Sequence, residues 1–276
     1  MFDSYRYVRR AALVAAVSLA AGRGLSAQTD YYNTDRGRPV QIEDAYSTER
    51  HAFELKVAPV RLERSRGPVY TWTAEPEVAY GILPRTHVEI GVPLVYSDIA
   101  GQRTRGLAGV DLSVFHSFNV ETETFPALAL RADVLAPVGS LAPDKAYSSL
   151  TGLMTRTFSA LRIHANGQYT FGSAPTASSS AAQSEVSRWL AGVAIDKTYP
   201  LRSILLTAEL FARGPFESAG DIEYNAGTGI RYQWSPTLAL DVGVGRRLSG
   251  DNPAWYLTFG SAYAFAVRSL IPGVGR

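Results

Sequence analysis

The sequence predicts an all-β protein: an antiparallel transmembrane β-barrel of about 12 strands, with its N- and C-termini on the periplasmic side. Three observations predict this fold class. Apolar residues alternate with polar ones from Ala52 to Val267, the alternating runs are long, and their connections alternate between long and short. A closed antiparallel barrel with an even number of strands shows these features together.

The alternation places apolar and polar side chains on opposite faces of each predicted strand. Tyr70, Trp72 and Val78 fall on one parity, whereas Glu75 and Glu77 fall on the other. Successive side chains of a strand point to opposite faces, so each run has one apolar face and one polar face. Further runs begin at Phe53, Val88, Val110, Leu128, Leu150, Leu161, Trp189, Ile204, Ile222, Leu238 and Trp255.

The length of these runs favours a membrane barrel over a soluble sandwich. Strands of soluble proteins average about 5–6 residues, and a tilted strand needs about 9–11 residues to cross a bilayer. The runs here match the longer figure. Their polar face carries charged residues, amides, glycine and serine, as a water-lined lumen would.

The connections predict the orientation of the barrel. With a periplasmic N-terminus, every second connection should be external and long. The predicted external set is Arg64–Pro68, Ser97–Gly106, Pro137–Ala146, Ser173–Ser184, Gly214–Gly220 and Ser249–Pro253. The predicted internal set is Gly81–Arg85, Glu121–Thr124, Ser159–Ala160, Thr198–Arg202 and Ser235–Pro236.

The first 27 residues have the layout of a secretory signal peptide. Arg6, Arg9 and Arg10 precede the uncharged apolar stretch Ala11–Ala21, and Ala27 supplies a small residue at the expected cleavage site. An 11-residue apolar stretch is too short to span a bilayer core of about 30 Å as a helix. The predicted organisation is a signal peptide over 1–27, an irregular periplasmic or plug segment over 28–51, the barrel over 52–267 and a tail over 268–276.

Composition excludes several function classes. The chain has no cysteine, which excludes disulfides, thiolate metal sites and a lipid-anchored N-terminus. The formal charge is +2, and the signal peptide alone contributes four arginines against one aspartate, a net +3 that leaves −1 for the rest. No basic patch indicates nucleic acid, and no residue spacing indicates a cofactor or a calcium loop. We therefore expect no cofactor.

Histidine placement argues against catalysis. A barrel hydrolase needs a serine and a histidine on one strand face. His116 and Ser117 are adjacent, so they point to opposite faces, and His116 falls on the lipid-facing parity. His164 and Asn166 share a face but have no serine two residues away. We expect no enzyme; a membrane hydrolase using His164 is the weakest alternative.

The predicted lumen is the candidate functional site, and it contains both signs of charge. These side chains form either the lining of a selective pore or a mutually paired network that fills a narrow barrel. Gly227, Gly229, Gly243, Gly245 and Gly260 share the inward parity, and we expect them to serve curvature or close packing. The lumen-lining candidates are Glu75, Glu77, Glu89, Asp111, Arg131, Asp133, Arg162, His164, Asn166, Gln168, Glu209, Glu223, Asn225, Arg231 and Asp241.

Three short motifs resemble a known family. They are the stretch from Asn33 to Pro39 followed by Glu43-Asp44-Ala45, the stretch Glu75–Ile82, and Phe125–Leu130 ending in Ala136-Pro137-Val138-Gly139. They resemble a bacterial outer-membrane family named for a MetA pathway of phenol degradation and often called simply "transporter". The resemblance implies an outer-membrane barrel that passes hydrophobic or aromatic compounds. The chain departs from common barrels in continuing for nine residues, Arg268–Arg276, beyond its last strand.

Two functions remain open from the sequence. The first is a porin-like channel or facilitator in the outer membrane of a Gram-negative cell, for small solutes, with hydrophobic or aromatic compounds as the candidates. The second is a structural or adhesive barrel with an occluded lumen, in which the external loops carry the function. Both place the barrel in outer-membrane lipid after signal-dependent export, and neither involves nucleic acid.

Overall fold

The computed structural model describes residues 33–65, 67, 69–175, 186–216, 220–249 and 253–267. The predicted signal peptide, residues 28–32 and the C-terminal tail lie outside the described residues, as does most of the predicted external connection Ser173–Ser184. Within the described ranges, no helix is long and apolar enough to cross a lipid bilayer.

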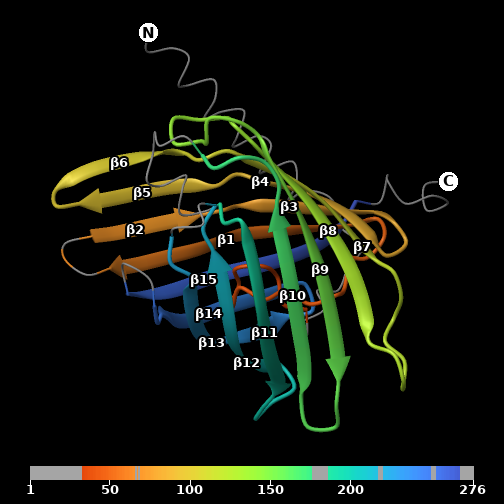
Figure 1. Ribbon diagram of the computed structural model, residues 1–276. Helices are drawn as coiled ribbons and strands as arrows, with labels where there is room; N and C mark the ends of the chain where they lie inside the picture. Colours follow the sequence, from red (N-terminus) through yellow and green to blue (C-terminus); the bar gives the residue numbers. More distant parts are fainter. Residues whose placement is uncertain are drawn as a thin grey trace.

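One antiparallel sheet forms the whole wall of the barrel (Figure 1). Each strand pairs with its neighbours, and β15 pairs with β1 over Ala52–Ser65, which closes the ring. The strands are β1 Ala52–Ser65, β2 Val69–Ala74, β3 Glu77–Leu83, β4 Thr86–Gly91, β5 Leu94–Ile99, β6 Gln102–Leu107, β7 Val110–Ser117, β8 Ala127–Ala136, β9 Tyr147–Thr157, β10 Arg162–Thr170, β11 Trp189–Thr198, β12 Ile204–Gly214, β13 Glu223–Ser235, β14 Leu238–Arg247 and β15 Ala254–Ala266.

In the part of the chain that the structure describes, fifteen strands make twelve barrel strands, because three of the barrel strands are each built from two consecutive pieces. β2 continues into β3 across Glu75-Pro76, and β4 continues into β5 across Val92-Pro93. Proline has no N–H for the ladder, so pairing is interrupted at each. β6 continues into β7 across Ala108-Gly109, where Gly109 has φ 142°. The prediction of an all-β, antiparallel barrel of 12 strands is confirmed; the periplasmic placement of its termini stays a prediction.

The two faces of the wall carry the side chains that the alternation predicts. Along β8, Ala127, Ala129, Arg131 and Asp133 are buried toward the lumen, while Val134 is exposed on the outside. The outward face holds large apolar side chains from every part of the ring, including Trp72, Leu112, Val193, Leu210 and Val242. His116 is outward-facing, and its Nδ1 lies 2.9 Å from the hydroxyl of Thr86.

The connections define two ends of the barrel. We call the end with residues 65, 67, 69, 100–101, 137–146, 171–175, 186–188, 215–216, 220–222, 248–249 and 253 the loop rim, and the opposite end the turn rim. The prediction of a long loop over Ser97–Gly106 is wrong. β5 and β6 extend through that range and meet in a tight turn at Ala100-Gly101, where both residues have positive φ. Cross-strand pairs such as Tyr96↔Arg105 stabilise this extension of the sheet.

Candidate functional site: the lumen and the segment inside it

Residues 33–51 are here called the N-terminal segment; residues 33–48 lie inside the barrel, whereas Glu49 and Arg50 are exposed. Val40, Ile42, Asp44 and Ala45 are at most 3% exposed. Ile42 packs with Leu190, Ala194 and Phe211 of the wall, and Ala45 packs with Phe115, Ala127, Ala129 and Leu153. This apolar contact comes from strands on several sides of the ring, so the segment crosses the lumen.

The segment forms a closed loop whose tip points toward the loop rim. At its base, the N–H of Asp44 donates to the carbonyl of Thr34 at 3.1 Å, and the N–H of Thr34 donates to the Asp44 carboxylate at 2.9 Å. At its tip, the N–H of Arg38 donates to the carbonyl of Asp35, and Gly37 has φ 81°. Only a residue that tolerates the left-handed region makes this turn cheaply.

Wall side chains satisfy the main chain of the segment. Glu209 of β12 accepts from the N–H groups of Gln41 and Ile42 at 2.7 and 3.0 Å. Asn166 of β10 accepts from the N–H of Glu43 at 2.7 Å and donates to its carbonyl at 2.8 Å. A buried irregular chain needs such partners for its polar backbone.

Further wall contacts come from β7, β9 and β15. Thr155 of β9 accepts from the N–H of Ala45, and Ser117 of β7 donates to the Ala45 carbonyl, both at 2.9 Å. Thr258 of β15 donates to the carbonyl of Pro39 at 2.7 Å. Together with Glu209 and Asn166, these side chains show that the wall is built to hold this particular backbone path.

Asp35 anchors the tip of the segment in a cluster of cations. Its carboxylate lies 3.1 Å from Lys56 Nζ, 2.7 Å from an Arg231 nitrogen and 2.5 Å from an Arg38 nitrogen. Asp241 bridges the same two arginines at 3.0 and 2.7 Å. Burial opposes the charge of Asp35, but the three cations outweigh it and hold the pKa of this carboxyl well below its usual range.

A second cluster joins the segment to the other side of the lumen. Arg131 of β8 lies 3.2 Å from Glu43, 2.7 Å from Asp133 and 3.4 Å from Glu89. Lys56 pairs with Glu89 at 2.7 Å, which links this cluster to the first. The charges of the segment are therefore complementary to those of the wall, and the lumen is filled by ion pairs at this level.

Arg36 and Asp44 of the segment differ in their partners. Arg36 reaches Asp111 at 2.7 Å and Asp133 at 3.5 Å. Within the described part of the chain, the Asp44 carboxylate accepts hydrogen bonds from the N–H groups of Thr34 and Tyr46, and burial raises its pKa well above the ordinary value although Arg162 acts in the opposite direction.

Two inward glycines make room for the segment. A Cβ on Gly229 would lie 2.5 Å from Cβ of Pro39, and a Cβ on Gly243 would lie 2.3 Å from the Pro39 carbonyl oxygen. Both distances are far below van der Waals contact. The expectation that these glycines serve close packing agrees with this geometry. Gly245 instead makes room for the Tyr256 ring, and Gly227 makes room for the Glu209 side chain and the Tyr256 hydroxyl.

The Gly229→Ala variant is expected to displace the segment at Pro39 while the barrel stays closed. The added methyl group meets Pro39 itself, so the segment has to give way first. Limited thermolysin digestion, which cuts before exposed apolar residues such as Val40 and Ile42, should cleave the variant several times faster than the parent. Gly167→Ala is the matched control, because nothing lies within 4 Å of a Cβ on Gly167. Equal cleavage of both variants would contradict the assigned packing.

The surroundings of His164 are structural. Its ring lies in line between Asp196, 2.9 Å from Nε2, and Thr155, 2.9 Å from Nδ1. This order resembles a nucleophile, a base and an orienting carboxylate. However, Thr155 is 0% and His164 1% exposed, and the hydroxyl already accepts from Ala45 of the segment. No substrate can approach that oxygen while the segment is in place.

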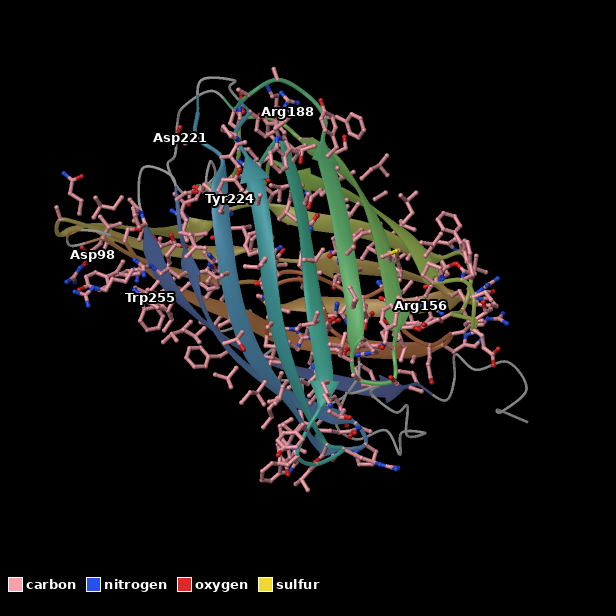
Figure 2. All side chains as sticks on the ribbon, turned by 60° about the horizontal axis from the view of Figure 1, so that its bottom comes forward. Asp98, Arg156, Arg188, Asp221, Tyr224 and Trp255 are labelled. Carbon is pink, nitrogen blue, oxygen red and sulfur yellow. The ribbon has the colours of Figure 1, made fainter. Side chains whose placement is uncertain are left out.

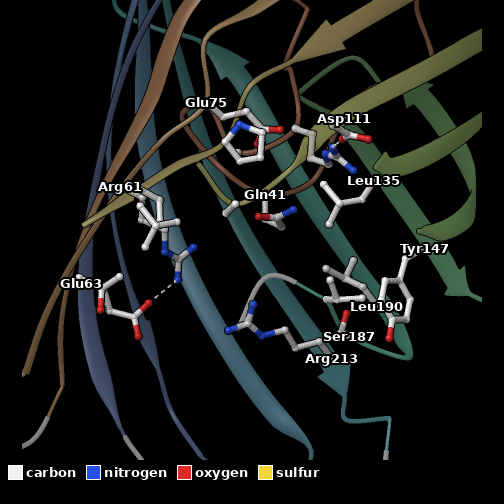
Figure 3. A pocket seen from close by; sticks show the side chains of 18 of the residues that line it. Gln41, Arg61, Glu63, Glu75, Asp111, Leu135, Tyr147, Ser187, Leu190 and Arg213 are labelled. Atoms are coloured by element: carbon white, nitrogen blue, oxygen red, sulfur yellow. Dashed lines mark hydrogen bonds and ion pairs between the residues drawn. The ribbon is translucent and has the colours of Figure 1, made fainter. Parts of the chain in front are cut away.

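A cavity of about 390 Å³ lies between the tip of the segment and the loop rim (Figure 3). Arg36, Gly37 and Gln41 of the segment contribute to the lining of this cavity, so the segment closes the end of the cavity that faces the turn rim. On one side of the cavity, Glu63 pairs with Arg61 at 3.2 Å and with Arg247 at 2.6 Å. The rest of the lining includes a group of apolar side chains: Val69, Val95, Ala108, Leu135, Tyr147 and Leu190.

The structure gives each lumen-lining candidate a position. Glu75, Asp111 and Gln168 line the cavity, Arg162 pairs with Asp196, and Glu223 pairs with Arg213 and Arg247. The others are buried inside the barrel: Glu77, Glu89, Arg131, Asp133, His164, Asn166, Glu209, Asn225, Arg231 and Asp241.

Several residues of the site were missed by the sequence analysis. Lys56 and Asp196 have the same inward parity as the candidates, so the alternation was sufficient to find them. Asp35, Arg36 and Arg38 lie in an irregular segment without periodicity, and no sequence signal links them to wall residues up to 203 positions away.

Comparison with known proteins shows the fold. The chain is similar to the COG4313 outer membrane channel from Pseudomonas putida F1, with a TM-score of 0.57, 11% identity, and 80% of this chain and 98% of that chain covered. It is also similar to the KdgM porin, with a TM-score of 0.50, 12% identity, and coverage of 76% and 98%. No family model and no curated protein sequence matches the chain, so the phenol-degradation family is not confirmed. The chain has the fold that these outer-membrane channels and porins share.

Proposed function

We propose that the protein is an outer-membrane channel for small, partly apolar solutes such as aromatic compounds, and that the N-terminal segment is a plug that must move for passage. The observation that carries the proposal is the cavity at the loop rim, which ends on the tip of the segment. The similarity to a channel and a porin of the same fold supports it.

The size and lining of the cavity fit such solutes. An apolar cavity of about 150 Å³ is large enough to bind benzene, and this one measures about 390 Å³. Its apolar side chains would contact a ring, while its charged and amide groups would contact a polar substituent. Twelve strands enclose a lumen between the filled interior of eight and the water channel of sixteen.

Solute uptake by proteoliposomes tests the proposal. The probes are benzenesulfonate and gluconate, because both carry one negative charge and only the first has an apolar ring. We expect the protein to take up benzenesulfonate faster than gluconate. The isosteric Val69→Thr/Val95→Thr variant, which adds hydroxyls to the cavity wall, should reduce that preference by several fold.

The matched control makes the same exchange at Val114 and Val134, which face outward. It should leave the preference unchanged. Uptake no faster than in empty liposomes, for both the full chain and a variant without the plug, would contradict a channel.

A structural or adhesive barrel is the second candidate, and the buried ion pairs favour it. Arg38, Lys56, Arg131 and Arg231 are at most 2% exposed and all have carboxylate partners. Such a network can serve simply to fill the lumen permanently. Solute uptake by the full chain distinguishes the two functions, because a permanently filled barrel would take up neither probe while the segment is in place.

A further inference from the structure

We infer that the outward face of the barrel at the loop rim binds the head group of a phosphorylated glycolipid of the outer leaflet. The binding surface, here called the arginine patch, consists of Arg64, Arg103, Arg105, Arg246, Tyr70 and Trp255. The inference rests on the proposed outer-membrane location and on the predicted orientation with the loop rim outside, but not on transport, since the patch lies outside the lumen.

Strand register brings the patch together from residues far apart in the sequence. Trp255 of β15 is paired with Arg64 of β1 on one side and with Arg246 of β14 on the other. Arg64 is paired in turn with Tyr70 of β2. Because paired residues have Cβ atoms about 4.5–5.5 Å apart, the two arginines that flank Trp255 are separated by roughly 10 Å.

The row continues across the protruding hairpin of β5 and β6. Tyr70 is paired with Asp98, which is paired with Arg103. Arg105 lies one step along, opposite Tyr96. Figure 2 shows Asp98 and Trp255 at the same end of the barrel. The long hairpin therefore extends the patch sideways along the rim.

The guanidinium groups are held ready for an anion. Arg246 lies 5.1 Å from the centre of the Trp255 ring, and Arg64 lies 5.6 Å from the centre of the Tyr70 ring. Arg103 pairs with Asp98 at 3.0 Å. Among the described residues, no carboxylate lies within ion-pair distance of Arg64, Arg105 or Arg246. Three positive charges of the patch thus have no negative partner in that part of the chain.

The depth of the patch indicates a head group. One row nearer the middle of the barrel, the same outward face carries Val244, Leu257 and Leu62. Strand faces of this kind contact acyl chains, and aromatic residues mark the boundary with head groups. Cations at that boundary attract anionic lipid, and arginine binds phosphate through two donors at once. Two arginines on either side of a tryptophan suit a sugar head group with two phosphates.

Native mass spectrometry of the detergent-purified full chain tests the patch. The probes are diphosphoryl lipid A, monophosphoryl lipid A and phosphatidylglycerol. We expect diphosphoryl lipid A to bind most tightly. In Arg64→Gln/Arg246→Gln its Kd should rise at least about tenfold, equivalent to about 1.4 kcal/mol, with solute uptake unchanged.

The control variant is Lys197→Gln/Arg202→Gln, which removes two exposed positive charges at the turn rim. Its lipid affinity should stay within about twofold of the parent. An equal loss of lipid A affinity in the control variant would show that positive charge anywhere on the barrel attracts the lipid, and it would overturn the site. Equal affinity for phosphatidylglycerol, or no binding of lipid A, would also overturn it. Neither result would affect the channel proposal, which uptake measures separately.

Discussion

Deleting residues 34–44 and joining Asn33 to Ala45 through two glycines is expected to turn a closed barrel into an open one. The deleted loop is closed at its base by hydrogen bonds between Thr34 and Asp44, so its two ends already lie together. The wall keeps its own ion pairs after the deletion, including Arg231 with Asp241 and Lys56 with Glu89. Ala45 keeps its contacts with Thr155 and Ser117.

Planar-bilayer recording measures this effect. The full chain should show a conductance close to that of the bare bilayer, with rare openings, whereas the deletion variant should show frequent openings of a defined size. Heat-dependent mobility in SDS is the control for folding, because a closed barrel has every backbone hydrogen bond paired around the ring. A closed and folded deletion variant would overturn the plug. A full chain that is already as open as the variant would do the same.

The Asp35→Arg variant is expected to release the segment from the lumen without removing any of the chain. It replaces the carboxylate that Lys56, Arg38 and Arg231 share with a fourth cation. Removing one partner of a buried ion pair costs about 3–5 kcal/mol. Each 1.4 kcal/mol is a factor of ten in an equilibrium constant. The population with the segment outside should therefore rise by roughly two to four orders of magnitude.

Thermolysin cleavage before Val40 or Ile42 and the frequency of channel openings should both report the release. Asp35→Glu keeps the charge and should behave nearly as the parent does. Asp221→Arg makes the same charge reversal in an exposed loop at the loop rim and should change neither readout (Figure 2). If thermolysin cleaves Asp35→Arg no faster than Asp221→Arg, the ion pairs at the tip do not retain the segment in the lumen.

The sequence determined the barrel because its signal is local. A side chain's face depends only on its position in the strand, so alternation predicted the closed wall and the inward positions of residues such as Arg131, Glu209 and Asp241. The same reasoning ruled out a pairing of His116 with Ser117. It could not foresee that β2/β3, β4/β5 and β6/β7 are each interrupted, although Pro76 and Pro93 provide the reason for two of them.

Only the tertiary structure decided what fills the lumen. The sequence left a selective pore and a paired network equally open, because pairing inside a barrel joins residues from different strands and depends on register. It also left the position of residues 33–51 open. Their contacts with Glu209, Asn166, Thr155 and Arg231 span more than a hundred positions in the chain. Hydrogen bonds and charges at such separations leave no periodic trace, so their partners appear only when the barrel has closed around them.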